Sequence, residues 1–373
     1  MNILLTNSTT IFAGGEDYVL ILAKYLQQRG HTVHVSALPG HLLLEKCAAA
    51  RIPTLPIRYS GMGNVFGVAA ELRKQIRTHA IDIIHSNANY DRTCAALAAA
   101  GSRARHVASV HSAHSIQYNL THYLRNHFGT SQFIADAEAV RSVLIANDGL
   151  PSDRVSVIPI GVEEADRSLS AAARKEFRAE INARPSTIVI GNVARLVPFK
   201  GHRYLLQAVA GVVRTHPDVF FPIIGDGELF ASLTDQARAL GIERYVGFLG
   251  FRDNLETIYP GFDIYCHSSL ELAAEAFPLA ILRALSTGLP VVSTRVGGIS
   301  SMVQENISGF LTAPEDPAAF AAALSRLIRD ETLRNSMGKK SYELFREKFH
   351  AAAMAESVEG IYRQVLDRDE DGD

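Results

Sequence analysis

Short apolar runs rich in β-branched residues alternate with longer helix-like stretches along this 373-residue chain. Several of the short runs are apolar at consecutive positions, as strands buried on both faces of a parallel sheet are. Alternation of this kind predicts an α/β fold with a doubly wound parallel sheet. The expected strands are Asn2–Thr6, Thr32–Leu38, Ile81–Ser86, Arg105–Val110, Gln132–Ala135, Val155–Ile158, Thr187–Val193, Val219–Ile224, Tyr245–Leu249, Asp263–His267 and Val291–Thr294.

The pattern occurs once in each half, so we expect two Rossmann-like domains. A chain longer than ~250–300 residues usually forms more than one core. The polar segment 163–186 interrupts the pattern, and we predict domains at 1–165 and 166–350. Ligands of such sheets bind at the carboxyl ends of the strands. Two such domains in series are therefore expected to enclose a cleft, and functional residues are expected there.

Bulk composition excludes several classes of protein. The formal net charge is −2, which gives no global attraction for nucleic acid. No apolar run reaches the ~18 residues of a membrane span, and the N-terminus lacks the features of a secretion signal. The three cysteines are far apart, which predicts buried thiols and no metal site. We expect a cytoplasmic protein, or one peripheral on the cytoplasmic face of a membrane. Residues 1–170 are slightly basic, which would favour an anionic membrane surface, although ordinary scatter of charge explains this excess better.

Two candidate sites lie in the first half. Gly14 and Gly15 follow the first expected strand, where glycine lets a ligand approach the start of a helix. A plain turn is the alternative. His111 follows the strand Arg105–Val110 and could hydrogen-bond a sugar hydroxyl, although a histidine that only caps its loop would look the same. His114 is a lesser candidate.

The second half holds the remaining candidates. Arg195 and Lys200 follow the strand Thr187–Val193, and this pair of cations suits a diphosphate, although surface pairs of this kind are common. Gly225 lies in a strand-to-helix turn that could border the ligand or be only a turn. Glu275 precedes a predicted helix that starts near Pro278 and ends at Gly288. The helix start at Phe277, Pro278 and Leu279 offers free N–H groups to an anion. The alternative is that Glu275 is only a solvated glutamate in the loop before this helix.

Together these segments resemble the family-four retaining glycosyltransferases of GT-B fold. The resemblance rests on GG before LAKYLQQRGHTVHV, on ARLVPFKG, IIGDGEL, YVGFLGF and EAFPLAILRALSTGLPVVSTRVGGISSMV, and on the last helix with GIYRQVL. It implies two domains facing across a cleft, with the helix 351–366 packed back on the first. It also implies a nucleotide diphosphate-sugar as donor, no obligatory metal or other cofactor, and a glycan, lipid-linked or small-molecule acceptor.

The resemblance assigns roles to individual residues. Arg195 and Lys200 would hold the donor diphosphate, and Gly15 would lie under it. Beside these, we expect Gly14, Gly225 and Arg283 to be donor-binding residues. Glu275 and the segment Phe277–Leu279 would engage the donor sugar and phosphates, and His111 would contact the sugar near the reacting carbon. The family has a second glutamate eight positions after the first, which binds the ribose. Here that position is Arg283, which cannot accept a hydrogen bond.

Arg283 keeps a second function open. An inactive GT-B scaffold that binds nucleotides and acts as a regulator would tolerate this change. A nucleotide-sugar epimerase of the same architecture is a third possibility, but it requires a set of acid/base carboxylates that we do not find in the sequence. The main prediction is a hexosyltransferase for which Arg195, Lys200, His111 and Glu275 are the catalytic residues.

Overall fold

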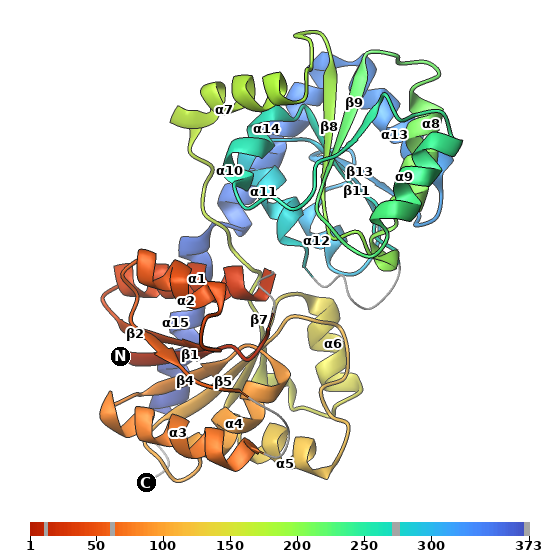
Figure 1. Cartoon of the computed structure of the whole chain (residues 1–373). Helices are drawn as coiled ribbons and strands as arrows, with labels where there is room; N and C mark the ends of the chain where they lie inside the picture. The colour runs from red at the N-terminus through yellow and green to blue at the C-terminus, as the bar shows by residue number, and fades with distance from the viewer. Residues whose placement is uncertain (11–13, 60–63, 271–276, 369–373) are drawn as a thin grey trace. The chain divides into compact units, whose positions relative to one another are not determined.

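The computed structural model describes residues 1–10, 14–59, 64–270 and 277–368. It divides into two compact units, shown in Figure 1. The first unit comprises Met1–Val162 and the residues from His350 onward, and the second comprises Glu163–Phe349. Each unit is built on one parallel sheet with helices on both faces, so the predicted fold class is confirmed for each half of the chain.

The described residues of the first unit form a seven-stranded sheet of order β3-β2-β1-β4-β5-β6-β7. The chain starts in the middle and winds outward to both edges, as a doubly wound sheet requires. The strands are β1 Asn2–Thr6, β2 Thr32–Ala37, β3 Thr54–Pro56, β4 Ile83–Ser86, β5 Arg105–Val110, β6 Gln132–Ala135 and β7 Val155–Val157. The helices are α1 Gly14–Gln28, α2 Leu42–Ala49, α3 Val65–Thr78, α4 Asn89–Ala99, α5 Leu120–Phe128, α6 Glu138–Ala146 and α15 Ala351–Asp367.

Helix α1 buries one apolar face. Val19, Leu22, Ala23 and Leu26 are all buried, because residues three and four apart share one face of a helix. Two residues past its end, Gly30 has φ 87°, a left-handed conformation that glycine adopts without steric cost.

The last helix, α15, packs on this first unit, beside α1. Its stripe of Met354, Val358, Tyr362 and Val365 is buried, which explains why a helix at the end of the chain carries an apolar face. One polar residue is buried with the stripe. The Glu359 carboxylate contacts Arg29 at the end of α1, His31, and Arg363 one turn further along α15.

Glu359 should make the stability of the first unit sensitive to acid. Burial raises the pKa of its carboxyl, but hydrogen bonds from Arg29 and Arg363 outweigh burial and lower it from 4.5 to about 2. A depressed folded-state pKa contributes stability above the unfolded pKa, and this stability is lost as the pH falls from about 4.5 to about 2. We expect urea unfolding to show a shallower loss of stability over that range in Glu359→Gln than in the wild type. Equal slopes would contradict this role for Glu359.

The described residues of the second unit form a six-stranded sheet of order β10-β9-β8-β11-β12-β13. Its strands are β8 Ile188–Val193, β9 Val219–Ile224, β10 Val246–Phe248, β11 Ile264–His267, β12 Val291–Thr294 and β13 Gly309–Thr312. Its helices are α7 Arg167–Glu180, α8 His202–Val212, α9 Phe230–Ala239, α10 Leu255–Ile258, α11 Leu279–Thr287, α12 Ile299–Met302, α13 Pro317–Arg329 and α14 Glu331–Lys348. Helices α8, α9 and α13 cover one face, and α7, α10, α11 and α14 the other (Figure 1).

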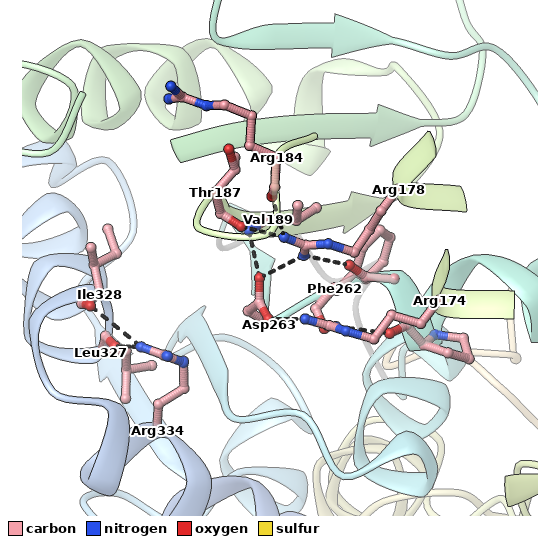
Figure 2. A network of polar contacts seen from close by, with 12 residues as sticks. Arg174, Arg178, Arg184, Thr187, Val189, Phe262, Asp263, Leu327, Ile328 and Arg334 are labelled. Carbon is pink, nitrogen blue, oxygen red and sulfur yellow. Dashed lines mark hydrogen bonds and ion pairs between the residues drawn. The ribbon is translucent and has the colours of Figure 1, made fainter. Parts of the chain in front are cut away.

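The polar segment between the two repeats forms helix α7, and ion pairs fix it to the second unit (Figure 2). Arg174 Nη2 lies 2.6 Å from Asp263 Oδ1, and Arg178 Nη1 lies 3.0 Å from Asp263 Oδ2. The N–H of Val189 also donates to Asp263 Oδ2 at 2.8 Å. Asp263 and Val189 lie at the amino-terminal ends of the strands, so this network supports the sheet at the edge opposite the candidate site.

The sequence predictions missed two strands, β3 and β13. Both are short edge strands, and β3 ends in Pro56, which cannot donate to a ladder and is therefore a poor strand signal. The three cysteines are free and buried, as predicted. Among the described helices, none has both the length and the apolar character needed to cross a membrane.

Candidate functional site

In the second unit, the two predicted cations lie around one aromatic ring. Arg195 follows β8, and the Pro198–Lys200 turn carries Phe199 and Lys200. The Arg195 guanidinium carbon is 5.8 Å from the centre of the Phe199 ring, and Lys200 Nζ is 5.4 Å from it. Arg195 is exposed and Lys200 half-buried. Both positive charges thus lie near one ring after the carboxyl end of β8, an arrangement suited to a polyanion.

Gly201 joins this turn to helix α8 and is required there for two reasons. Its φ is 67°, and a Cβ atom at this position would lie 2.0 Å from the carbonyl oxygen of Ser268. The two segments are also linked directly. Ser268 Oγ donates to the Lys200 carbonyl at 2.9 Å, and the Leu270 N–H donates to the Phe199 carbonyl at 2.8 Å. The turn with Lys200 is therefore fixed to the segment that follows β11.

Gly225 fixes the segment that carries Arg195. Its φ is 141°, and an added Cβ would lie 2.0 Å from the Ala194 carbonyl oxygen. The neighbouring Asp226 carbonyl accepts from the Leu196 N–H at 2.9 Å. The loop after β9 thus lies directly against residues 194–196, and its glycine allows this approach. This contact supports a positioning role for Gly225, whereas the sequence suggested only a border of the ligand site or a turn.

The start of α11 forms another part of this edge. The helix begins at Leu279, one residue later than predicted, and Pro278 is its N-cap. Phe277 is buried and packs edge-to-face on Phe349, with 5.8 Å between ring centres. Gly288 ends the helix with φ 79°, as predicted. Glu275, the predicted sugar-binding carboxylate, lies outside the described residues.

Arg283 lies in the second turn of α11 and is half-buried. Its positive charge acts on the buried Tyr259, whose hydroxyl donates to the Ala280 carbonyl at 2.9 Å. Burial raises the pKa of Tyr259, and the Arg283 charge opposes that rise. This position therefore brings a cation near the first turn of α11.

A buried histidine supports the same edge and was missed in the sequence. His202, the first residue of α8, has its Nε2 3.1 Å from Asn192 Oδ1, and Asn192 Nδ2 donates to the Cys266 carbonyl at 2.9 Å. Burial, together with the charges of His267 and Lys200, lowers the pKa of His202 to about 3. The neutral ring therefore links β8, β11 and the start of α8, which keeps the ends of these elements in register.

In the first unit, His111 pairs with a carboxylate that the sequence analysis did not identify. His111 follows β5 and Asp136 follows β6, so parallel pairing brings them together. His111 Nδ1 lies 3.5 Å from Asp136 Oδ2, and Asp136 is 3% exposed. Both ring nitrogens and both carboxylate oxygens are buried without a hydrogen-bond partner among the described residues. Buried polar atoms are usually hydrogen-bonded, so this unsatisfied pair requires an explanation, of which a catalytic role is one.

Further polar side chains surround this pair. The Tyr18 ring lies edge-on to His111, 4.7 Å between ring centres, and its hydroxyl is 3.1 Å from Ser109 Oγ. Ser109 Oγ is in turn 2.8 Å from His85 Nε2, and His85 Nδ1 is 2.6 Å from the Tyr362 hydroxyl of α15. Burial lowers the pKa of His85 to about 3, so this ring is neutral. The last helix thus supports the residues behind His111.

The glycine pair lies in the first turn of α1, whereas the sequence placed it in a loop before the helix. A Cβ atom on Gly15 would meet nothing within 4 Å, so packing in this structure does not require glycine there. The next residue, Glu16, is buried and accepts a hydrogen bond from Asn7 Nδ2 at 3.0 Å. His114 is exposed.

The structure therefore gathers Arg195, Lys200, Gly225 and the start of α11 at one edge of the second sheet. His111 lies at the carboxyl end of the first sheet, and the glycine pair at the start of α1. A cavity of about 420 Å³ lies elsewhere, at the amino-terminal edge of the second sheet. Its Asp218 carboxylate already accepts from Arg184, Ser186 and Thr187, so this cavity is not our candidate site.

Comparison with known families decides the identity of the chain. Residues 12–166 match the model "Glycosyltransferase Family 4", and residues 173–344 match "Glycosyl transferases group 1". The chain belongs to glycosyltransferase family 4. Each of the two units of this family 4 chain is thus matched by one of the two family models.

Curated relatives and solved structures agree with this assignment. The D-inositol 3-phosphate glycosyltransferase of Corynebacterium urealyticum is 33% identical over 59% of this chain and 53% of its own length. The family 4 chain spans about half the length of such relatives. A glycosyltransferase structure from Rickettsia africae has a TM-score of 0.88 at 20% identity, with 98% of each chain covered. Anabaena HepE, solved with UDP and with UDP-glucose, has a TM-score of 0.84 at 22% identity, covering 98% of this chain and 100% of its own. These structural matches show the fold.

Proposed function

We propose that this family 4 chain transfers a hexose-type sugar from a nucleotide diphosphate-sugar to an acceptor hydroxyl, with retention of anomeric configuration. The observation that supports it best is the pair Arg195 and Lys200, held around Phe199 at the carboxyl end of the second sheet. The two cations at this edge of the sheet are suited to a nucleoside diphosphate, which is a polyanion. Anabaena HepE, which has a similar fold, was solved with UDP and with UDP-glucose, and this agrees with a nucleotide-sugar donor for the present chain.

In this proposal, charge develops on the leaving diphosphate as the bond between the anomeric carbon and the phosphate oxygen breaks. Arg195 and Lys200 stabilise that charge, and preorganised cations lower such barriers strongly. The acceptor oxygen bonds to the anomeric carbon on the same face, and its proton passes to the departing phosphate. Glu275 and the segment Phe277–Leu279 would engage the donor sugar and phosphates. The cations Arg195 and Lys200 take the place of a metal.

The acceptor in this proposal is a glycan, a lipid-linked saccharide or a small molecule. His111 would contact the donor sugar near the reacting carbon, and Asp136 would act as a positioning residue behind it. A carboxylate 3.5 Å from Nδ1 favours a proton on that nitrogen, which leaves Nε2 for the ligand.

Asp136→Asn tests this positioning role. We expect kcat to fall by about 10- to 100-fold, the size of effect seen when the partner that orients a metal-bound histidine is removed. The decisive measurement is a double-mutant cycle with His111→Ala, with folding of each variant checked by circular dichroism. If Asp136 acts through His111, Asp136→Asn changes little in the His111→Ala background. Additive losses would show that Asp136 acts independently of His111.

The experiment that tests the function is calorimetric titration with UDP, GDP, ADP and their sugar conjugates. Selective binding of one sugar nucleotide supports a donor site and names the base. That donor is then incubated with and without candidate acceptors, and the sugar products are separated. Transfer only with an acceptor supports the proposal, whereas a changed sugar without acceptor identifies an epimerase.

Arg283 favours one second candidate, an inactive scaffold that binds nucleotides or a partner. A cation replaces the glutamate that would accept hydrogen bonds from the ribose hydroxyls, and Arg has no acceptor atom. Absence of binding to every nucleotide by the folded protein would favour the form of this candidate that acts through a partner. Arg283→Glu is then the informative variant, because restored nucleotide binding would assign the loss to this one position.

A further inference from the structure

Four buried polar side chains connect the last helix, α15, to the surroundings of His111. They are Tyr362 on α15, His85 on β4, Ser109 on β5 and Tyr18 on α1, and we call them the Tyr362 network. Each is at most 2% exposed. Their links in this order measure 2.6, 2.8 and 3.1 Å, so hydrogen bonds join all four. An apolar stripe alone would have been enough to pack α15, and this polar network therefore requires a separate explanation.

The Tyr362 network ends beside His111. The Tyr18 ring lies edge-on to the His111 ring, with 4.7 Å between ring centres and 63° between ring planes. Ser109 and His111 are two positions apart at the end of β5, so their side chains point to the same face of the sheet. Burial is the main cause of the low pKa of His85, and the charge of His111 lowers it further. A change in the network therefore reaches His111 through ring packing, through the strand and through charge.

The neutral ring of His85 allows two directions for these hydrogen bonds, because it donates from one nitrogen and accepts at the other. In the first, Nδ1–H donates to Tyr362, and the buried hydroxyl proton of Tyr362 has no acceptor among the described residues. In the second, the Tyr362 hydroxyl donates to Nδ1, and Nε2–H donates to Ser109. The second direction moves the one proton without an acceptor to the other end of the network, at Ser109 or Tyr18.

The buried charge of Asp136 selects the second direction. Burial is the main cause that raises the pKa of Tyr18, and the negative charge of Asp136 raises it further. Hydroxyl dipoles turn their protons toward a negative charge, so the proton without an acceptor is placed at the end near Asp136 and not at Tyr362. His85 therefore carries its proton on Nε2. Each hydrogen bond of the network then points from α15 toward the pair of His111 and Asp136.

We infer that Tyr362 is a positioning residue for His111. The Tyr362 hydroxyl fixes the tautomer of His85, and this tautomer orients the Ser109 hydroxyl. Ser109 in turn holds Tyr18, whose ring packs against His111. The last helix thus contributes one hydroxyl group to the site, in addition to its apolar stripe. The expected effect on the rate rests on the proposed role of His111 in sugar transfer, but the state of the His111 ring is measurable without that reaction.

The first test is NMR of the histidine rings in the unliganded protein, with isotope-labelled histidine and each signal assigned by a variant that lacks that histidine. We expect the wild-type His85 ring to be the Nε2–H tautomer. Tyr362→Phe keeps the aromatic ring and removes only the hydroxyl, and it should shift the ring signals of both His85 and His111. An Nδ1–H tautomer of His85 in the wild type would overturn the inference. A shifted His85 signal beside an unchanged His111 signal would overturn it as well.

Tyr59→Phe is the matched control. Tyr59 is also buried in the first unit, and its hydroxyl lies 2.9 Å from Ser36 Oγ. It packs with residues of α3 and α4, on the other side of the unit's core from the Tyr362 network. This variant removes a comparable buried hydrogen bond and should leave the His111 signals at their wild-type positions. A His111 shift of the same size in Tyr59→Phe and Tyr362→Phe would overturn the inference, because general loosening of the unit would explain both.

The second test is the rate of sugar transfer with saturating donor. Tyr362→Phe should lower kcat by about 3- to 30-fold, within the range of couplings between residues of one hydrogen-bond network. The same change should have little effect in the His111→Ala background, and Tyr59→Phe should retain the wild-type kcat. Equal losses in both backgrounds would overturn the action of Tyr362 through His111. The expected NMR shifts in a protein that transfers sugar from no nucleotide donor would support the inference and contradict the proposed function.

Discussion

Replacement of Arg195 or Lys200 by alanine is expected to lower the rate of sugar transfer by about 10²- to 10³-fold, the effect of removing one preorganised group from a developing negative charge. Both side chains lie around Phe199 at the carboxyl end of the second sheet. Arg195 is exposed and Lys200 half-buried, so both variants are expected to fold. Initial rates with saturating donor, and thermal unfolding of each variant, measure the two effects separately.

The control for this result is an arginine of the same unit that lies away from the candidate site. Arg238 on α9 is exposed and pairs with Asp235 at 2.9 Å. Arg238→Ala should retain wild-type rates. Wild-type turnover in both Arg195→Ala and Lys200→Ala would rule out a role for these cations in transfer. A loss of the same size in Arg238→Ala would show that the effect is not specific to the site.

Gly201→Ala is expected to destabilise the second unit by about 3 kcal/mol or more, at the upper end of single substitutions. Two costs combine at this position. An alanine at φ 67° carries a left-handed penalty of about 1–2 kcal/mol, and its Cβ would lie 2.0 Å from the Ser268 carbonyl oxygen. Because backbone cannot move away as a side chain can, the Lys200 turn must separate from Ser268. Urea unfolding measures the change in free energy.

Gly241 provides the matched control for the steric part. It has φ 68°, almost the same as Gly201, but an added Cβ there would meet nothing within 4 Å. Gly241→Ala should therefore cost only the left-handed penalty of about 1–2 kcal/mol. If both variants lose the same stability, the close contact with Ser268 contributes nothing. If Gly201→Ala loses more, the difference measures that contact.

Local patterns were sufficient to predict most of the fold. Buried parallel strands such as Ile188–Val193 are apolar at consecutive positions, which is visible without any tertiary information. The end of α1 at Gly30 and the end of α11 at Gly288 were also predictable, because a left-handed backbone selects glycine. The edge strands β3 and β13 were missed because three or four residues without a strong apolar pattern give no signal of their own.

The candidate site was predictable only where residues are close in sequence. Arg195 and Lys200 are five positions apart, directly after a strand, so their shared location could be inferred from the chain alone. The pairing of His111 with Asp136 could not, because 25 residues separate them and a lone aspartate after a strand forms no motif. The same is true of the contact between Gly201 and Ser268.

The sequence by itself therefore determined the class of fold, its two sheets and the family of this chain, because these depend on short-range periodicity and on motifs of adjacent residues. Only the tertiary structure decided which side chains meet across strands. Parallel pairing of β5 with β6 brings Asp136 to His111, and the buried hydrogen bonds of His85 link Tyr362 of α15 to Ser109 on β5. Such contacts depend on register and on the burial of polar groups, and neither property is visible in a linear pattern of residues.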